Sequence, residues 1–231
     1  MLRFLLCWCV CYVNSADVVF YLHGGGSSPG DMNAQHSITN TVATSVNIQG
    51  PIEEWFGYVW VSDPPDVIHS PPDQLTIAAL DDASIGNRVI GIVGYSQGCA
   101  AGLAYVAHLF EQDREHDLRF FACFCGYVPV ERYAMYQRIL SQSPMNVPAW
   151  IGVGVSDTLF GPDVTIYEGY PDYRTSVIAS FFNTSQLHMI SSDHSCNLGT
   201  PNSDFSSFVS TYGFPSPPSP PPPPSCSPHL T

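Results

Sequence analysis

The chain has 231 residues, of which 45% are hydrophobic and 12% are charged, a composition that fits one α/β domain with short extensions. Twenty acidic residues against seven basic ones give a formal net charge of −13. Proteins bind nucleic acids and anionic membrane surfaces through basic patches, so this charge balance argues against both as partners.

The first fifteen residues have the pattern of a secretory signal peptide. Arg3 precedes an apolar run of about ten residues, and small residues lie before Ala16, where a signal peptidase would cut. The run is too short to span a bilayer. We expect a secreted protein that begins near Ala16 and has no transmembrane segment in the mature chain. If residues 1–15 form a strand or a buried arm instead, the protein would be cytoplasmic.

Removal of Cys7, Cys9 and Cys11 with that segment leaves five of the eight cysteines. An odd number cannot form a complete set of internal disulfides. No cysteine and histidine cluster has the spacing of zinc ligands, and we expect neither a metal nor a cofactor. Cys123 and Cys125 face the same side of an expected strand and cannot bridge each other without strain. Cys99 is expected to be a small buried side chain. The other two remaining cysteines are Cys196 and Cys226.

Apolar runs alternate with helical stretches along the rest of the chain. Several runs are apolar on both strand faces, which is typical of a parallel sheet covered by helices on both sides. Residues 16–213 are therefore predicted to form one α/β domain. Predicted strands are 17–22, 58–61, 88–93, 118–124, 147–155 and 186–190; predicted helices are 74–83, 97–111, 131–140, 174–182 and 205–212, with weak helical periodicity at Ile38, Val42 and Val46.

Residues 214–231 are rich in proline. Such a segment favours polyproline II geometry and cannot join a core. We expect a disordered tail, with a spacer or a contact to a cell wall or matrix as the alternatives.

The most informative motif is Gly94-Tyr-Ser-Gln-Gly98, between the predicted strand 88–93 and the predicted helix 97–111. A G-x-S-x-G sequence in that setting predicts a nucleophile elbow. The sharp turn would expose the hydroxyl of Ser96 and point the backbone N–H of Gln97 at the same space. The alternative is an ordinary turn with a helix-capping serine.

A serine nucleophile needs a base and a carboxylate, which follow it in the order Asp or Glu, then His, in hydrolases with an elbow. Asp157 directly follows an apolar strand, and Asp163 is its nearest competitor. His194 lies in the loop after the last strand and is the predicted base. His188 lies within that strand and is predicted to be structural, alternating with core residues. Three further histidines, predicted to be solvated, are His108, His116 and His229.

An oxyanion hole needs two backbone N–H groups. Gln97 would supply one from the N-terminus of its helix, where the helix dipole also favours a negative charge. The loop His23-Gly24-Gly25-Gly26 fits the HGGG pattern of lipases and esterases. We assign the second donor to Gly25, with Gly26 as the alternative.

At this point the chain resembles the FSH-type family of α/β-hydrolase serine hydrolases, related to the phospholipase and carboxylesterase branch. The resemblance covers roughly residues 17–212 and implies an α/β-hydrolase fold with little or no cap domain. It also implies hydrolysis of carboxylic esters or acyl thioesters without a metal or cofactor, and it supports Ser96, Asp157 and His194 as the triad. The matching segments are 19–24, 91–98, 120–129, 147–157 and the His194 region.

The sequence departs from the family pattern at three points. The family usually has glycine before the catalytic histidine, where this chain has Asp193, and it lacks both the signal segment and the proline tail. A second carboxylate beside His194 could compete with Asp157 for the imidazole. We expect Asp157 to prevail because adjacent residues rarely aim their side chains at each other.

We therefore predict a serine esterase that acts on a small-molecule or lipid-like acyl ester. The main alternatives are a thioesterase and a secreted binding protein that keeps the fold without turnover. Aromatic residues in 55–60, together with Phe160, are expected to line the acyl pocket. Asn183-Thr-Ser185 is a glycosylation sequon that applies if the chain is secreted.

Overall fold

The computed structural model describes residues 15–54, 57–61, 74–114, 117–141, 147–166, 168 and 171–214. Several sequence-based predictions lie outside these ranges and stay predictions. They concern the signal segment before residue 15, the tail after residue 214, and Trp55, Phe56, His116, Cys226 and His229.

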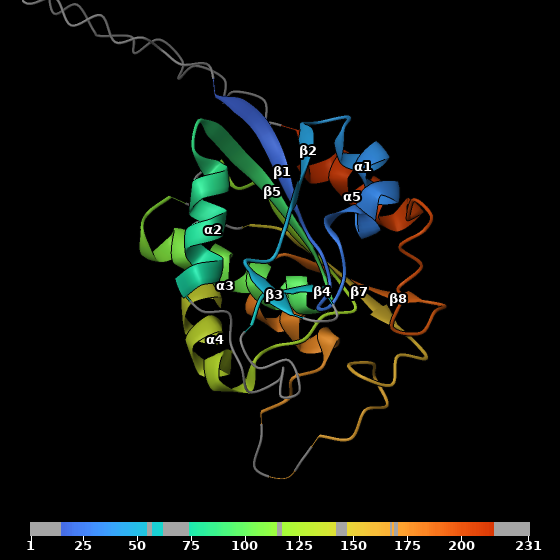
Figure 1. The fold of residues 1–231 in the computed structure, drawn as a ribbon. Helices are drawn as coiled ribbons and strands as arrows, with labels where there is room; N and C mark the ends of the chain where they lie inside the picture. The colour runs from blue at the N-terminus through green and yellow to red at the C-terminus, as the bar shows by residue number, and fades with distance from the viewer. Residues whose placement is uncertain are drawn as a thin grey trace, which may run out of the picture.

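A six-stranded sheet forms the centre of the molecule (Figure 1). Every neighbouring pair of its strands is parallel, which confirms the predicted parallel sheet. In spatial order the strands are β2 (Thr44–Ile48), β1 (Ala16–Leu22), β5 (Asn87–Tyr95), β6 (Phe120–Phe124), β7 (Ala149–Gly154) and β8 (Ser185–Ile190).

Helices cover both faces of this sheet (Figure 1). One face carries α2 (Gln74–Ser84), α3 (Gln97–Glu111), α4 (Tyr133–Ser141) and the 3-10 helix η5 (Thr175–Phe181), and the other carries α1 (Asn33–Thr39) and α5 (Ser203–Tyr212). Two further 3-10 turns are η1 (Pro29–Met32) and η4 (Val130–Arg132). No helix in the described ranges is long and apolar enough to cross a bilayer.

The central strands are apolar throughout because both of their faces are buried. All residues of β6 and β7 are buried. Phe121 and Ile151 pack under α3 and η5, while Phe120 and Trp150 pack toward α5. Since side chains alternate between the two faces of a strand, a strand between two helix layers needs an unbroken apolar run.

The first helical prediction was wrong in part. Ile38 lies in α1, but Val46 lies in β2, paired beside Phe20 of β1. The periodic apolar spacing therefore ran across a helix–turn–strand boundary. The structure has a short hairpin of β3 (Ile52–Glu54) and β4 (Gly57–Val59), where the sequence predicted a single strand at 58–61.

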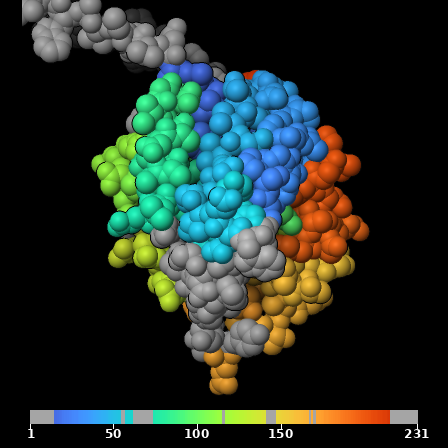
Figure 2. Space-filling model, in the orientation of Figure 1, coloured from blue at the N-terminus to red at the C-terminus, as the bar shows by residue number. Residues whose placement is uncertain are grey.

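In Figure 2 the N-terminal part of the chain, coloured blue to cyan, covers the middle of the face in view.

Two disulfides join elements that the sequence leaves far apart. Cys99 at the start of α3 pairs with Cys123 of β6, and Cys125 pairs with Cys196. The expectation that Cys99 is only a small buried side chain was wrong. The first turn of α3 packs over β6, which brings the Cα atoms of Cys99 and Cys123 to 5.3 Å, within the range that a disulfide spans.

The sheet order places a crevice between β1 and β5. The chain leaves β1 toward β2 on one side and later adds β5 on the other. Loops from the carboxyl ends of two such strands diverge, and ligands of open α/β sheets bind at that point. The glycine loop after β1 and the serine turn after β5 meet there.

Candidate active site

A strained turn between β5 and α3 presents Ser96. This residue has φ 50° and ψ −119°, a conformation that costs on the order of 1–3 kcal/mol outside glycine. A Cβ atom at Gly94 would lie 2.6 Å from the backbone nitrogen of Cys99, and one at Gly98 would lie 2.0 Å from the carbonyl oxygen of Leu22. Both flanking glycines are therefore required by the close approach of strand and helix.

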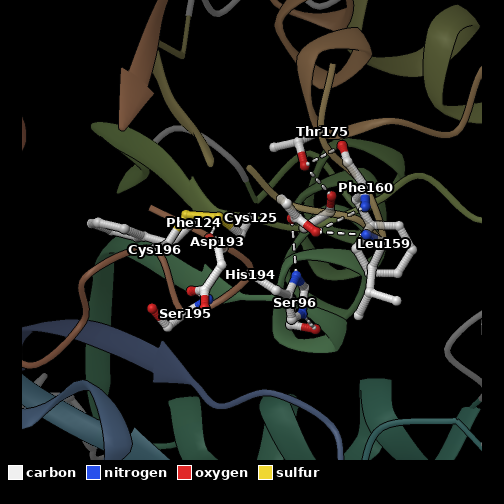
Figure 3. A network of polar contacts seen from close by, with 12 residues as sticks. Ser96, Phe124, Cys125, Leu159, Phe160, Thr175, Asp193, His194, Ser195 and Cys196 are labelled. Carbon is white, nitrogen blue, oxygen red and sulfur yellow. Dashed lines mark hydrogen bonds and ion pairs between the residues drawn. A yellow bond between two sulfur atoms is a disulfide. The ribbon is translucent and has the colours of Figure 1, made fainter. Parts of the chain in front are cut away.

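The structure brings Ser96, His194 and Asp157 into one hydrogen-bonded row, and Figure 3 shows Ser96 and His194 side by side. Ser96 Oγ lies 2.9 Å from His194 Nε2, and His194 Nδ1 lies 2.9 Å from Asp157 Oδ2. With an ionised Asp157, Nδ1–H donates to the carboxylate and Nε2 accepts from the serine hydroxyl. This tautomer is the one that a general base for Ser96 requires.

Asp157 is held as a carboxylate in the first turn after β7. Its Oδ1 accepts the N–H groups of Leu159, at 2.8 Å, and Phe160, at 3.1 Å. Burial alone would raise the pKa of Asp157, but the hydrogen bonds from His194 and from these two amides outweigh it and leave the pKa below its ordinary value. The carboxylate is therefore charged at neutral pH.

Asp193 points away from the imidazole despite its position in the chain. Its Oδ1 accepts the N–H of Ser195 at 2.9 Å, and Figure 3 shows it beside Ser195 while the His194 ring faces Ser96. The hydrogen bonds with Ser195 are the main cause that lowers the pKa of Asp193. Asp163, the other carboxylate considered, is exposed in the loop after Asp157.

Two further histidines considered from the sequence, His188 and His108, lie apart from this row. His188 is in β8, where its ring stacks on Trp150 and Nδ1 lies 3.4 Å from Asp204. Its neighbours Leu187 and Met189 are 48% and 53% exposed, so the expectation that they are core residues was wrong. These two side chains lie on the open face of an edge strand. The surface His108 pairs with an aspartate of α2, Asp81.

The two expected donors, Gln97 and Gly25, both line the cavity at Ser96. Gln97 N–H is at the N-terminus of α3. In the glycine loop, Gly26 N–H donates to Tyr58 O at 3.0 Å, which occupies the donor that we considered as an alternative. Gly25 N–H has no hydrogen-bond partner within the described residues. Gln97 and Gly25 thus remain the candidate donors to an oxyanion beside Ser96.

A buried network that the sequence did not reveal fixes this pair of donors. His23 Nε2 accepts the N–H of Gly50 at 2.9 Å, while Nδ1 lies 2.7 Å from Gly24 O. Trp60 connects the two sides: its indole N–H donates to His23 O at 2.8 Å, and its backbone N–H donates to Gln97 Oε1 at 2.7 Å. A buried histidine next to glycines was the only signal available in the sequence.

A cavity of about 460 Å³ opens above Ser96. Its wall includes the glycine loop, Val59, Tyr127, Leu159 and Phe160. The expected lining was therefore right for Phe160, whereas Tyr58 and Trp60 do not line the cavity and the other aromatic residues of 55–60 are not described. An adjoining groove of about 500 Å³ shares Asp31 and Tyr95 with the cavity and continues along residues 195 and 197–200.

A family model described as "Serine hydrolase (FSH1)" matches residues 32–196. The match covers well over half of the chain and includes Ser96, Asp157 and His194. The chain belongs to the FSH1 serine hydrolase family.

Comparison with solved structures supports the fold of this FSH1 serine hydrolase. A carboxylesterase from Mesorhizobium loti superposes with a TM-score of 0.57 at 16% identity, covering 84% of this chain and 87% of that one. The Bacillus cereus carboxylesterase gives 0.51 at 18% identity, covering 78% and 81%. Est1E from Butyrivibrio proteoclasticus, solved with ferulic acid bound, gives 0.52 at 12% identity, covering 86% and 90%. A comparison with curated sequences found no match.

These likenesses confirm the α/β-hydrolase fold. The FSH1 match begins after the glycine loop, so the assignment of Gly25 depends on the HGGG pattern and on the geometry and not on the family match. The described residues contain no group of three or more histidine, cysteine, aspartate or glutamate side chains that could hold a metal ion.

Proposed function

We propose that this FSH1 serine hydrolase cleaves carboxylic esters through an acyl-enzyme intermediate. The observation that carries the proposal is the row from Ser96 through His194 to Asp157, with 2.9 Å at both steps. Gln97 and Gly25 line the same cavity, and their backbone N–H groups have no partner among the described residues. A secreted binding protein without turnover, the alternative from the sequence, would have no need for a strained serine in hydrogen-bond contact with an imidazole.

In the proposed reaction, Ser96 Oγ attacks the acyl carbonyl while His194 Nε2 takes its proton. The negative charge that develops on the carbonyl oxygen is met by the N–H groups of Gln97 and Gly25. Asp157 holds the imidazole orientation and stabilises the imidazolium. His194 then protonates the departing alcohol, and a water molecule, activated by the same imidazole, releases the acid from Ser96.

The groove beside His194 supports a choice of leaving group. The alcohol must depart next to His194 Nε2 in the cavity, and the adjoining groove is lined by Tyr95 and by Ser195, the residue after His194. Asp31 is the charged residue in its wall, and no arginine or lysine lines either the groove or the cavity within the described residues. A phosphorylated leaving group, such as coenzyme A, would meet negative potential without a cationic partner. We therefore expect the enzyme to prefer esters of neutral or cationic alcohols.

A set of butanoyl substrates tests this proposal. We expect hydrolysis of p-nitrophenyl butanoate and of S-butanoyl-N-acetylcysteamine, a thioester without phosphates, and poor hydrolysis of butanoyl-coenzyme A. Comparison of the two thioesters separates the effect of charge from that of the sulfur leaving group. Efficient cleavage of the coenzyme A thioester would contradict the leaving-group assignment, and failure to cleave any of the three would contradict the proposed function.

We also propose that the protein is secreted. The pattern of residues 1–15 supports this proposal. The two disulfides support it as well, because disulfides persist in oxidising compartments. Asn183 of the glycosylation sequon is exposed, as a glycan would require. The small-molecule or lipid-like acyl ester expected from the sequence remains the proposed substrate, and contact of the proline tail with a wall or matrix remains a proposal.

A further inference from the structure

One buried hydroxyl in the cavity wall is unused by the proposed reaction. Tyr127 is 1% exposed, and its Oη has no hydrogen-bond partner. Among the described residues only one other buried side-chain polar atom, Trp150 Nε1, shares this condition, and Trp150 does not line the cavity. A buried hydroxyl without a partner destabilises the fold, so its retention needs an explanation.

The surroundings of Tyr127 fix its ring in the cavity wall. The ring stacks on Phe160 with centroids 4.6 Å apart and an interplanar angle of 29°. Phe160 in turn donates its N–H to Asp157. The preceding carbonyl, Gly126 O, accepts from Thr175 Oγ1 at 2.5 Å, and the following Val128 N–H donates to Tyr173 O at 3.0 Å. The backbone on both sides of Tyr127 is therefore held by hydrogen bonds, and its ring packs against Phe160.

The hydroxyl of Tyr127 is a neutral donor in this setting. Burial raises its pKa far above the ordinary value, and the nearby Gln97 side chain opposes this only in part. The Gln97 Oε1 atom already accepts the N–H of Trp60, which orients the amide so that its NH₂ group is the part left for other contacts. The hydroxyl of Tyr127 has no hydrogen-bond partner among the described residues, and Gln97 is the polar side chain that lowers its pKa.

The position of Tyr127 assigns it to the acyl side of the site. It lines the cavity above Ser96 but not the groove along Ser195 where the alcohol would leave. We propose that Tyr127 determines acyl specificity: its hydroxyl donates a hydrogen bond to an oxygen on the acyl chain, so that acyl groups with a keto, ether or hydroxyl oxygen are preferred over plain alkyl chains. This inference rests on the proposed ester hydrolysis and names the substrate class of that same site.

Matched pairs of p-nitrophenyl esters test the inference. One pair is 4-oxopentanoate and pentanoate, and the other is methoxyacetate and butanoate. Within each pair the chains have similar size and differ in one acceptor oxygen. The measured quantity is kcat/KM for the wild type and for Tyr127→Phe, expressed as the oxygenated-to-alkyl ratio. The chemical reactivity of each ester cancels when the ratio of the wild type is divided by that of the variant.

We expect Tyr127→Phe to lower the oxygenated-to-alkyl ratio about fivefold or more in at least one pair, the effect of one lost hydrogen bond, while the alkyl ester is cleaved at least as well as before. Tyr136→Phe is the matched control, because Tyr136 is also buried at 1% exposure and does not line the cavity; its ratios should equal those of the wild type. Equal ratios in wild type and Tyr127→Phe for both pairs would overturn the inference.

A second measurement needs no variant. The wild-type ratio in each pair is compared with the ratio of hydroxide-catalysed hydrolysis rates for the same two esters. We expect the enzyme to prefer the oxygenated ester beyond its chemical reactivity in at least one pair. An enzyme ratio at or below the hydroxide ratio in both pairs would also overturn the inference. Failure to cleave the alkyl esters at all would contradict the proposed function itself, which distinguishes the two failures.

Discussion

Asp157 and Asp193 are two carboxylates close to one imidazole, and their hydrogen bonds give them different tasks. Asp157 accepts His194 Nδ1–H and two backbone amides from a buried position, whereas Asp193 caps the exposed turn at Ser195. A carboxylate that is buried and bonded to the imidazole controls its tautomer, while an exposed carboxylate that faces solvent does not.

Replacement of each carboxylate by its amide separates the two tasks. We expect Asp157→Asn to lower kcat roughly 10⁴-fold, because the amide favours the wrong imidazole tautomer. Asp193→Asn should change kcat by less than about threefold, as for other surface substitutions. Initial rates on p-nitrophenyl butanoate check both variants. A severe Asp193→Asn and a mild Asp157→Asn would reverse the assignment.

Much of the candidate site could be predicted from the sequence because its residues follow strands directly. Ser96, Asp157 and His194 each lie just beyond an apolar run, and the carboxyl ends of parallel strands meet at one edge of a sheet. The partners of Cys99 and of His23 could not be predicted in this way. Their contacts depend on how α3 packs over β6 and how the β3–β4 hairpin folds back onto the glycine loop, which local patterns do not encode.

At the scale of elements, the Cys125–Cys196 disulfide ties the histidine loop to the sheet. Cys125 directly follows β6, and Cys196 lies two residues beyond His194 in the loop after β8. The other disulfide, Cys99–Cys123, joins α3 to β6 and leaves that loop untouched. The two bridges therefore have separable effects on the site.

Removal of each bridge tests this difference. A variant with Cys125→Ser and Cys196→Ser should lose about 2–5 kcal/mol of unfolding free energy, and its kcat should fall between about tenfold and a hundredfold because His194 is less well placed. A variant with Cys99→Ser and Cys123→Ser serves as the comparison: it should lose a comparable amount of stability, and its kcat should fall less because the loop that carries His194 stays tied to the sheet. Equal kcat losses in the two double variants would contradict a role for the first bridge in positioning His194.

The buried His23 predicts a pH dependence of stability. Burial is the main cause that lowers its pKa, and its Nε2 must stay unprotonated to accept Gly50 N–H. The unfolded chain therefore binds more protons than the folded one once the pH falls below about 6.5, so the free energy of unfolding decreases as the pH drops through that region, by up to about 1.4 kcal/mol per pH unit.

Urea unfolding at pH 7.5 and 5.5 measures this effect. The wild type should lose stability between the two values, and His23→Gln, although less stable at pH 7.5, should lose less. An equal pH-dependent loss in both proteins would show that His23 is not the group that titrates.

At the scale of the whole molecule, the catalytic loops share one edge of a parallel sheet whose two faces are covered by helices (Figure 1). Strands such as β6 and β7 are buried on both faces, so all their side chains are apolar and they stand out in the sequence as apolar runs. The alternation of these runs with helical stretches predicted the fold class. The β2 strand was misread because only part of its residues are buried, which weakens its pattern.

Secretion is tested on the protein made in a eukaryotic host. We expect N-terminal sequencing of the secreted product to start at or near Ala16, and the exposed Asn183 to carry a glycan that peptide N-glycosidase removes with a shift in mass. Asn183→Gln should abolish that shift. A mature product that begins at Met1 would contradict the secretion proposal and the glycan together.

An activated Ser96 should react covalently with a fluorophosphonate, and this labelling tests its role as the nucleophile. The wild-type protein should form one covalent adduct, located on Ser96 by peptide mass spectrometry. Ser96→Ala should remain folded, take up no label and lose on the order of 10⁶-fold in kcat. An unlabelled wild type, a label on another residue, or a Ser96→Ala variant with most of its turnover would contradict the account.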